Sequence, residues 1–438
     1  YTQGPVDCRH IIMDKKQNDS KSNIFDSLSH DERIFKNREA LSSTYIPKYF
    51  PHREEEIGNV ANILKPALNG SRPSNILIYG QTGTGKTAVA KFICDQITAK
   101  AKSDDKKIHT AYINCKQTNT TYSILSNIGK AYSKKWEKEI PIAGWRIDKV
   151  YAEVKQKAKE NGGIVILVLD EIDALVNKTG DDILYHLTSL NSDLENSKIS
   201  IIGISNDVKF TSWLDPRVKS RLGEESLSFA PYNAPQIEEI LYERAKIAFK
   251  ENVLEPLVVS YCSSKAAQEH GDVRKALDLL RISAELADRE EREIVTARYV
   301  NLAQNVMEND QVKNIVSSLP IQNKATFASI IVNQGSRKNG QQTTGEVYET
   351  YSRICNIFKL ELLTQRRISN LISELDMQGL VHARTVSLGR QGRTKYISLA
   401  IEENQLKVVM KNDSFFADIL EELEKSNVFP GSMQLRLM

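Results

Sequence analysis

The chain has little that would hold it in a membrane. Its longest apolar run, 164–169, is far shorter than the roughly 20 residues that span a bilayer as a helix. No charged-then-apolar segment opens the sequence, as a secretory signal would. We therefore expect a cytoplasmic protein with no membrane partner.

Cysteine and histidine are also scarce and scattered. The chain has 5 cysteines and 7 histidines, and none of them forms a Cys-x-x-Cys pair or a Cys/His pair with zinc-ligand spacing. We expect buried or free thiols in a reducing compartment rather than a disulfide framework or a zinc site. The cysteines are Cys8, Cys94, Cys115, Cys262 and Cys355.

One glycine-rich stretch carries a specific chemical signal. Residues 80–87 read Gly-Gln-Thr-Gly-Thr-Gly-Lys-Thr and match the phosphate-binding pattern G-x-x-x-x-G-K-[ST]. The apolar run 75–79 before it favours a buried strand, and 87–93 after it has helical periodicity, so a chance match in a turn is the weaker reading. Backbone N–H groups of such a loop surround phosphates at a helix N-terminus. The motif predicts a nucleoside triphosphate site formed by Gly80, Thr82, Gly83, Thr84, Gly85, Lys86, Thr87 and Ala88.

Acidic residues follow a second buried strand. The run 164–169 is apolar throughout, as in a parallel strand buried on both faces, and ends in Asp170 and Glu171. Because ligands collect at the carboxyl ends of such strands, we expect Asp170 and Thr87 to hold Mg²⁺, partly through water, and Glu171 to polarise the attacking water. Asn206 ends a third strand and can orient that water. An asparagine there also caps turns, and two acids can merely begin a loop.

The charge of the chain is concentrated in one segment. At 438 residues it is long enough for two or three domains, and its formal net charge is +3. Residues 311–400 contain 12 Lys and Arg against 5 Asp and Glu, whereas 401–438 contain 4 against 7. This asymmetry predicts a polyanionic partner, although a solvated basic face is the simpler alternative.

The basic segment has the pattern of a winged helix. The expected elements are helices over 323–334, from 343 with Thr344 as cap, and over 365–379, then strands over 380–387 and 394–399. A helix in the major groove beside a basic β-wing is one way to bind duplex DNA, and protein contact is the alternative role. The residues expected to contact DNA are Arg366, Arg367, Arg390, Arg393 and Lys395.

With these motifs, the chain resembles the AAA+ replication-origin initiators of the archaeal type, which are related to the eukaryotic origin recognition complex and helicase-loading factor. The resemblance extends over residues 30–400 and rests on three further stretches. Residues 34–53 are similar to the adenine-binding stretch, Asp-Pro-Arg-Val-Lys-Ser-Arg-Leu at 215–222 to the arginine-finger motif, and Gly-Asp-Val-Arg-Lys-Ala at 271–276 to the sensor motif of the lid.

The resemblance implies a fold and a division of the chain. It implies an α/β AAA+ ATPase base with a parallel sheet, an all-α lid domain and a C-terminal winged-helix domain. The parts that we expect are a flexible N-terminal segment at 1–40, the base at 41–232 with a helical insertion at 116–150, the lid at 233–309, the winged helix at 310–400 and an extension at 401–438.

The resemblance also implies roles for residues that no local pattern assigns. The nucleotide is expected to contact Tyr45, Pro47, Arg53, Tyr232, Arg244 and Arg274. Arg221, supported by Arg217, is expected to be the arginine finger, although a single helical arginine is by itself more often a surface charge. Trp145 and Arg146 in the insertion correspond to an exposed pair that touches DNA. The family has a smaller residue where this chain has Trp145, so Trp145 could equally be a buried core residue instead of a DNA contact.

The implied function is ATP-dependent recognition of a replication origin and initiation there. The cofactors would be ATP or ADP with Mg²⁺. The protein would be a slow ATPase that acts mainly as a DNA-binding switch. It would be associated with the nucleoid or, in a eukaryote, located in the nucleus. Its partners would be double-stranded origin DNA, other initiator protomers and the replicative helicase. A clamp-loader-like motor would need a C-terminal collar instead of the basic winged helix. A signalling AAA+ switch usually lacks the combined arginine-finger and Gly-Asp-x-Arg motifs.

Overall fold

The chain divides into two compact units, residues 1–300 and 301–438, which are considered separately. The structure is a computed structural model. It describes residues 33–118, 120–132, 140–141, 143–194, 196–212, 214–269, 271–335, 341–387, 393–402, 405–408 and 413–426.

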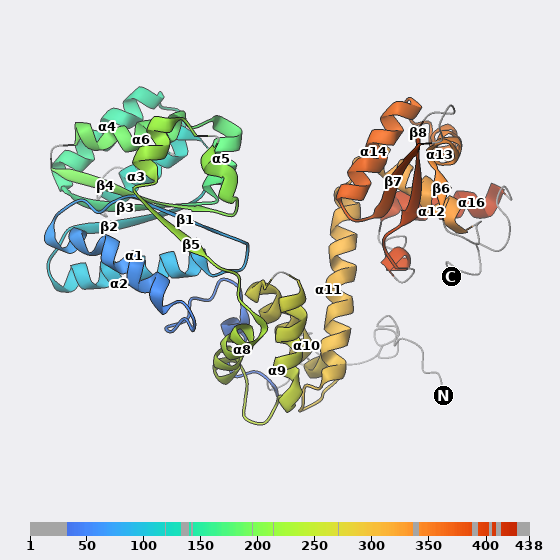
Figure 1. The fold of residues 1–438 in the computed structure, drawn as a ribbon, viewed down its shortest axis with the longest axis horizontal. Coiled ribbons are helices and arrows are strands. Elements are labelled where there is room, and N and C mark those ends of the chain that lie inside the picture. The colour runs from blue at the N-terminus through green and yellow to red at the C-terminus, as the bar shows by residue number, and fades with distance from the viewer. Residues whose placement is uncertain are drawn as a thin grey trace, which may run out of the picture. The chain divides into compact units, whose positions relative to one another are not determined.

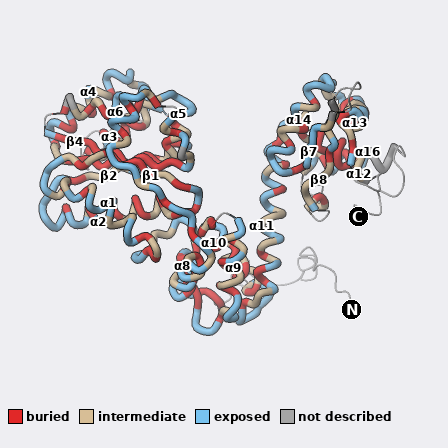
Figure 2. Tube along the Cα trace, in the orientation of Figure 1, coloured by how far each residue is buried: buried red, intermediate tan, exposed pale blue. Residues whose placement is uncertain are grey.

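The described strands of the first unit form a five-stranded parallel sheet in the order β2-β3-β4-β1-β5. They are β1 (Ile76–Gly80), β2 (Ile108–Asn114), β3 (Gly163–Asp170), β4 (Ser197–Ser205) and β5 (Glu225–Phe229). After its first residue β3 is buried throughout, as its apolar run predicts, because helices cover both faces of the sheet (Figure 2). The order places the carboxyl ends of β1, β3 and β4 together, and the phosphate loop, the acids and Asn206 follow these strands.

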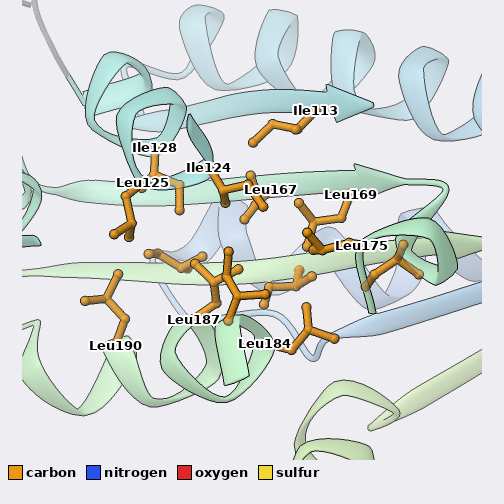
Figure 3. Close-up of a cluster of buried hydrophobic side chains, with 14 of the residues drawn as sticks. Ile113, Ile124, Leu125, Ile128, Leu167, Leu169, Leu175, Leu184, Leu187 and Leu190 are labelled. Atoms are coloured by element: carbon orange, nitrogen blue, oxygen red, sulfur yellow. The ribbon is translucent and has the colours of Figure 1, made fainter. Parts of the chain in front are cut away.

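Helices cover both faces of this sheet (Figure 1), and each face has its own apolar core. On one face lie α1 (Glu54–Leu64), η3 (Lys65–Asn69) and α2 (Lys86–Ser103). On the other lie α3 (Thr121–Tyr132), α4 (Ile147–Asn161), α5 (Ile172–Thr179) and α6 (Asp182–Asp193), followed along the chain by η4 (Val208–Ser212) and α7 (Pro216–Leu222). Figure 3 shows Leu184, Leu187 and Leu190 of α6 in the same cluster of buried side chains as Leu167 and Leu169 of β3.

The lid is helical, as expected. It consists of α8 (Ala234–Ala248), α9 (Pro256–Gln268), α10 (Val273–Arg289) and the start of α11 (Ala297–Ser318), within which the two units divide. The N-terminal stretch packs on it. Although 1–40 is expected to be flexible, Ile34 and Phe35 are buried, and η2 (Arg38–Leu41) contacts α8. Residues 1–32 lie outside the described residues.

The second unit is a winged helix. It contains α12 (Ile321–Gly335), β6 (Gln342–Thr343), α13 (Thr344–Phe358), α14 (Gln365–Met377), β7 (Val381–Ser387) and β8 (Arg393–Leu399), with an antiparallel sheet in the order β6-β8-β7. Thr343, one residue before the expected Thr344, caps α13 and forms a capping box with Glu346. The C-terminal extension adds α16 (Ser414–Ser426), whose Phe416 and Ile419 belong to the winged-helix core.

Two further features concern membranes and thiols. Within the part of the chain that the structure describes, no helix is long and apolar enough to cross a bilayer. The four described cysteines, Cys94, Cys115, Cys262 and Cys355, are buried and free. Burial raises the pKa of Cys94, Cys115 and Cys262 to about 12.

Candidate nucleotide and DNA sites

The phosphate loop connects β1 to α2 in a conformation that needs its glycines. Gly80 and Gly83 have φ values of 156° and 78°, and a Cβ on Gly83 would lie 1.9 Å from Oδ1 of Asp272 in the lid. Lys86 is 5 % exposed, and its Nζ donates to the carbonyl oxygens of Gly80 (2.8 Å) and Gln81 (2.6 Å). Burial and the nearby Arg274 lower the pKa of Lys86 to about 8.

Two hydroxyl groups converge on Asp170 at the end of β3. Thr87 Oγ1 and the Tyr112 hydroxyl both donate to Oδ2 of Asp170, at 2.9 and 2.6 Å. Lys91 Nζ lies 3.9 Å from the centre of the Tyr112 ring. A hydroxyl and a carboxylate that meet in this way are oxygen ligands of the kind that Mg²⁺ prefers, so Thr87 and Asp170 fit a magnesium site.

Glu171 is held by residues from the end of β2. It has a left-handed backbone, with φ 55°, and precedes α5. Asn114 Nδ2 donates to Oε1 at 3.2 Å, and Lys116 Nζ pairs with Oε2 at 2.6 Å. Burial opposes ionisation of Glu171, but the hydrogen bonds from Lys116 and Asn114 hold its pKa below the usual value.

Sequence reasoning did not identify Tyr112, Asn114 or Lys116. Their spacing indicates only that Tyr112 and Asn114 share a face of one strand, and it does not indicate which strand lies beside them. Alternate residues of a strand share a face, and the register pairs Asn114 with Asp170. Tyr112 and Asn114 at the carboxyl end of β2 therefore reach Asp170, the last residue of β3, and Glu171 directly after it.

A cavity of about 650 Å³ joins these groups to the lid. The predicted site residues that line it are Tyr45, Pro47, Gly83, Thr84, Gly85, Lys86, Thr87, Ala88, Asp170, Glu171, Asn206, Tyr232, Arg244 and Arg274. Gly80, Thr82, Arg53 and Arg221 are not among its lining residues. The phosphate loop thus lines one part of the cavity, Asp170 and Glu171 line another, and aromatic and aliphatic residues line a third.

Arg53 is buried and in contact with the phosphate loop. Its Nε donates to the carbonyl oxygen of Thr84 (3.1 Å) and the hydroxyl of Tyr232 (2.8 Å), and its Nη2 to the carbonyl oxygen of Ala230 (2.5 Å). Nη1 pairs with Glu56. The guanidinium therefore connects α1, the phosphate loop and the end of β5.

Arg244 connects the lid to the N-terminal stretch. From α8 it donates to the carbonyl oxygens of Ala40 and Tyr45, both at 3.2 Å, and its Cζ lies 4.8 Å from the centre of the Tyr45 ring. Burial lowers its pKa below the usual value. Arg274 is exposed in the first turn of α10, two residues after Asp272, which caps this helix. Sequence reasoning missed the contact of Asp272 with the loop.

Arg221 lies on α7, where its Nη1 donates to Ser189 Oγ of α6 at 2.8 Å. In the insertion, Trp145 is half-buried against the base core, and Lys149 Nζ lies 4.0 Å from its ring centre. The Arg146 side chain, just before α4, is 90 % exposed.

The basic residues of the winged helix differ in their surroundings. Arg366 and Arg367 are exposed in the first turn of α14. Lys395 instead directs its Nζ to the carbonyl oxygen of Ser369 (2.7 Å) and to Ser373 Oγ, both on α14, and burial lowers its pKa. Arg390 and the side chain of Arg393 lie outside the described residues.

Comparison with known families divides the chain in the same way. Residues 69–206 match an AAA domain, 238–305 a Cdc6 AAA+ ATPase-type lid domain, and 314–409 the CDC6 C-terminal winged helix domain.

Curated relatives are similar over almost the whole chain. An ORC1-type DNA replication protein of Thermococcus onnurineus is 44% identical over 91% of this chain and 95% of its own length. The ORC1-type DNA replication protein 1 of Methanosarcina acetivorans is 46% identical over 90% and 94%. The solved structure of the Aeropyrum pernix ORC1 protein in complex with DNA is 40% identical, covers 89% of this chain and 100% of that one, and has a TM-score of 0.77. The chain therefore belongs to the ORC1-type DNA replication proteins.

Proposed function

We propose that this chain binds duplex DNA at replication origins and initiates replication there, under the control of bound ATP or ADP. The observation that carries the proposal is a cavity that combines the phosphate loop, the acids and the lid in a chain that also has a basic winged helix. The proposed parts are the base at 41–232 with its insertion at 116–150, the lid at 233–309 and the winged helix at 310–400.

The cavity residues suggest how the nucleotide is held. The loop N–H groups and Lys86 would bind the phosphates, and the side lined by Tyr45, Pro47 and Ile240 would receive the base. Thr87 and Asp170 would hold Mg²⁺, which when bound neutralises phosphate charge. Arg274 would approach the γ-phosphate from the lid, so that the bound nucleotide sets the position of the lid relative to the loop.

Hydrolysis is proposed to be slow. Glu171 would polarise water, with Asn206 orienting it. The carboxylate of Glu171, however, is engaged by Lys116 and Asn114. A base whose oxygens both accept hydrogen bonds attracts a proton weakly, which supports the role of a switch rather than of a rapid motor.

DNA is proposed to bind at the exposed arginines of α14, at the wing and at Arg146 of the insertion. Arg366 and Arg367 lie in the first turn of the helix that corresponds to the recognition helix, whose N-terminal residues face base edges in helix-turn-helix docking. Other protomers would assemble on the DNA, with Arg221 completing a neighbour's site. Recruitment of the replicative helicase follows from family resemblance alone and belongs to the same proposal.

The test is the DNA that co-purifies with the full chain from its own cells. We expect the recovered DNA to concentrate where replication begins, as mapped independently by marker frequency. The purified protein should then bind the recovered duplex more tightly than a shuffled one across a salt series, and ATP and ADP should alter that affinity. Recovery spread evenly along the chromosome would contradict an origin-specific role.

A further inference from the structure

Three polar or aromatic residues, Asp181 at the N-cap of α6 and Tyr185 and Ser189 within it, form a row along the outer face of this helix. Asp181, Tyr185 and Ser189 are spaced four residues apart, so they lie on one face of the helix. The inner face of α6 packs Leu184 and Leu187 into the base core. The row is thus fixed in place by the core beneath it.

Each member of this row contacts α7 or its cap. Asp181 Oδ2 accepts a hydrogen bond of 2.5 Å from the backbone N–H of Asp215, the N-cap of α7. The centre of the Tyr185 ring lies 5.7 Å from Cζ of both Arg217 and Arg221. Ser189 Oγ accepts a hydrogen bond from Arg221. The row therefore fixes the start of α7 and both of its arginines.

Packing against the apolar core does not explain the position of Tyr185. Its side chain is 38 % exposed, so the ring does little to fill the core. It presents an aromatic face to two exposed guanidinium groups, an arrangement that the quadrupole of the ring favours. An exposed arginine otherwise samples many rotamers, and a ring beside two of them restricts that freedom.

We propose that Tyr185 and Ser189 are positioning residues for Arg221, holding its guanidinium ready to enter the nucleotide site of a second copy of this chain. The inference rests on the proposed role of Arg221 in a neighbour's site. Asp181 contributes by fixing the N-terminus of α7. Tyr185 acts through the arginine and does not itself touch the nucleotide.

The experiment mixes two defective full-length proteins on the co-purifying duplex and measures ATP hydrolysis. Lys86→Ala keeps the arginine but lacks the phosphate-binding lysine, whereas Arg221→Ala keeps the loop but lacks the arginine. Their mixture forms one interface with both parts. Adding Tyr185→Ala to the Lys86→Ala protein should lower hydrolysis by the mixture about tenfold or more, because the donated arginine is misplaced. Tyr185→Phe in the same position should leave hydrolysis unchanged, since the ring remains.

The control is the placement of the substitution. Tyr185→Ala added to the Arg221→Ala protein changes only the protomer that supplies the loop, so hydrolysis by the mixture should stay at the parental level. An equal loss in both placements would mean that Tyr185 supports the fold, and no loss in either would remove it from the site; both results overturn the proposal. If the parental mixture is itself inert although both proteins bind the duplex, the role of Arg221 fails, and the role of Tyr185 fails with it.

Discussion

Asp272 of the lid occupies the space into which a side chain on Gly83 would project. A Cβ there would lie 1.9 Å from Oδ1 and 2.8 Å from Cα of Asp272. The second atom belongs to the backbone, so rotation of the Asp272 side chain does not relieve the clash. The phosphate loop and the N-terminus of α10 are therefore in direct contact, and a change in either one displaces the other.

Gly83→Ala is expected to lower ATP affinity by an order of magnitude or more. The substitution forces the lid away from the loop and also strains a residue with φ 78°. Gly70→Ala is the matched control, because Gly70 has φ 76° but nothing within 4 Å of its Cβ position. Calorimetric titration of both variants separates an effect at the nucleotide site from the general effect of an alanine in the left-handed region. Equal affinities in the two variants would show that the contact with Asp272 does not affect nucleotide binding.

ATP affinity should fall as the pH rises above the pKa of Lys86, about 8. Phosphates favour the protonated lysine, so at pH 9 binding requires the uptake of a proton, and affinity should fall up to about tenfold per pH unit. Below pH 7 the lysine is already charged and contributes no slope. Titrations in buffers of different ionisation enthalpy measure the proton uptake directly. Lys86→Arg stays charged throughout, so a slope that persists in this variant would point to another group.

Glu171→Gln should bind ATP but hydrolyse it roughly 10²-fold more slowly, as for loss of a general base. The amide keeps the shape of the side chain but not its negative charge. Nucleotide binding by fluorescence titration and single-turnover hydrolysis together provide the measurement. Hydrolysis at the wild-type rate would mean that another residue orients the water.

Arg366→Ala and Lys395→Gln should differ in their effects on DNA binding, although both residues belong to the basic segment. Arg366 is exposed, so its loss should lower the slope of log affinity against log salt by about 1 if it contacts a phosphate. If it reads a base edge, preference at one position should relax instead. The ammonium of Lys395 is bound to α14, so Lys395→Gln should leave the salt slope unchanged. A slope lowered by about 1 in Lys395→Gln would place that residue on the DNA backbone.

Patterns that reflect burial and local backbone chemistry predicted most of the fold. The apolar run before Asp170 lies where the structure has β3, and the helix expected over 365–379 corresponds to α14, which ends two residues earlier at Met377. The cap of α13 was predicted one residue late because Thr343 and Thr344 are adjacent and equally suited. The AAA+ base, lid and winged helix are confirmed, whereas the roles of individual site residues remain predictions.

Contacts between distant elements were not predictable from single motifs. Tyr112, Lys116 and Asp272 reach the site because strand order and lid placement bring them there, and no short pattern records either of these. The expected DNA contact of Lys395 stays a prediction, whereas its contact with α14 could not be expected from the basic segment. Its partner Ser369 is 26 residues away, and only the packing of the wing on α14 places the two together.

The raised pKa values of the buried thiols have a practical consequence for measuring motion. With a pKa of about 12, only about one thiol in 10⁵ is ionised at pH 7, so Cys94, Cys115 and Cys262 should react very slowly with maleimide dyes. Once Cys8 is replaced, new surface cysteines on α1 and α9 could carry a donor and an acceptor fluorophore. The distance between them could then be followed in a chain that retains its native cysteines elsewhere.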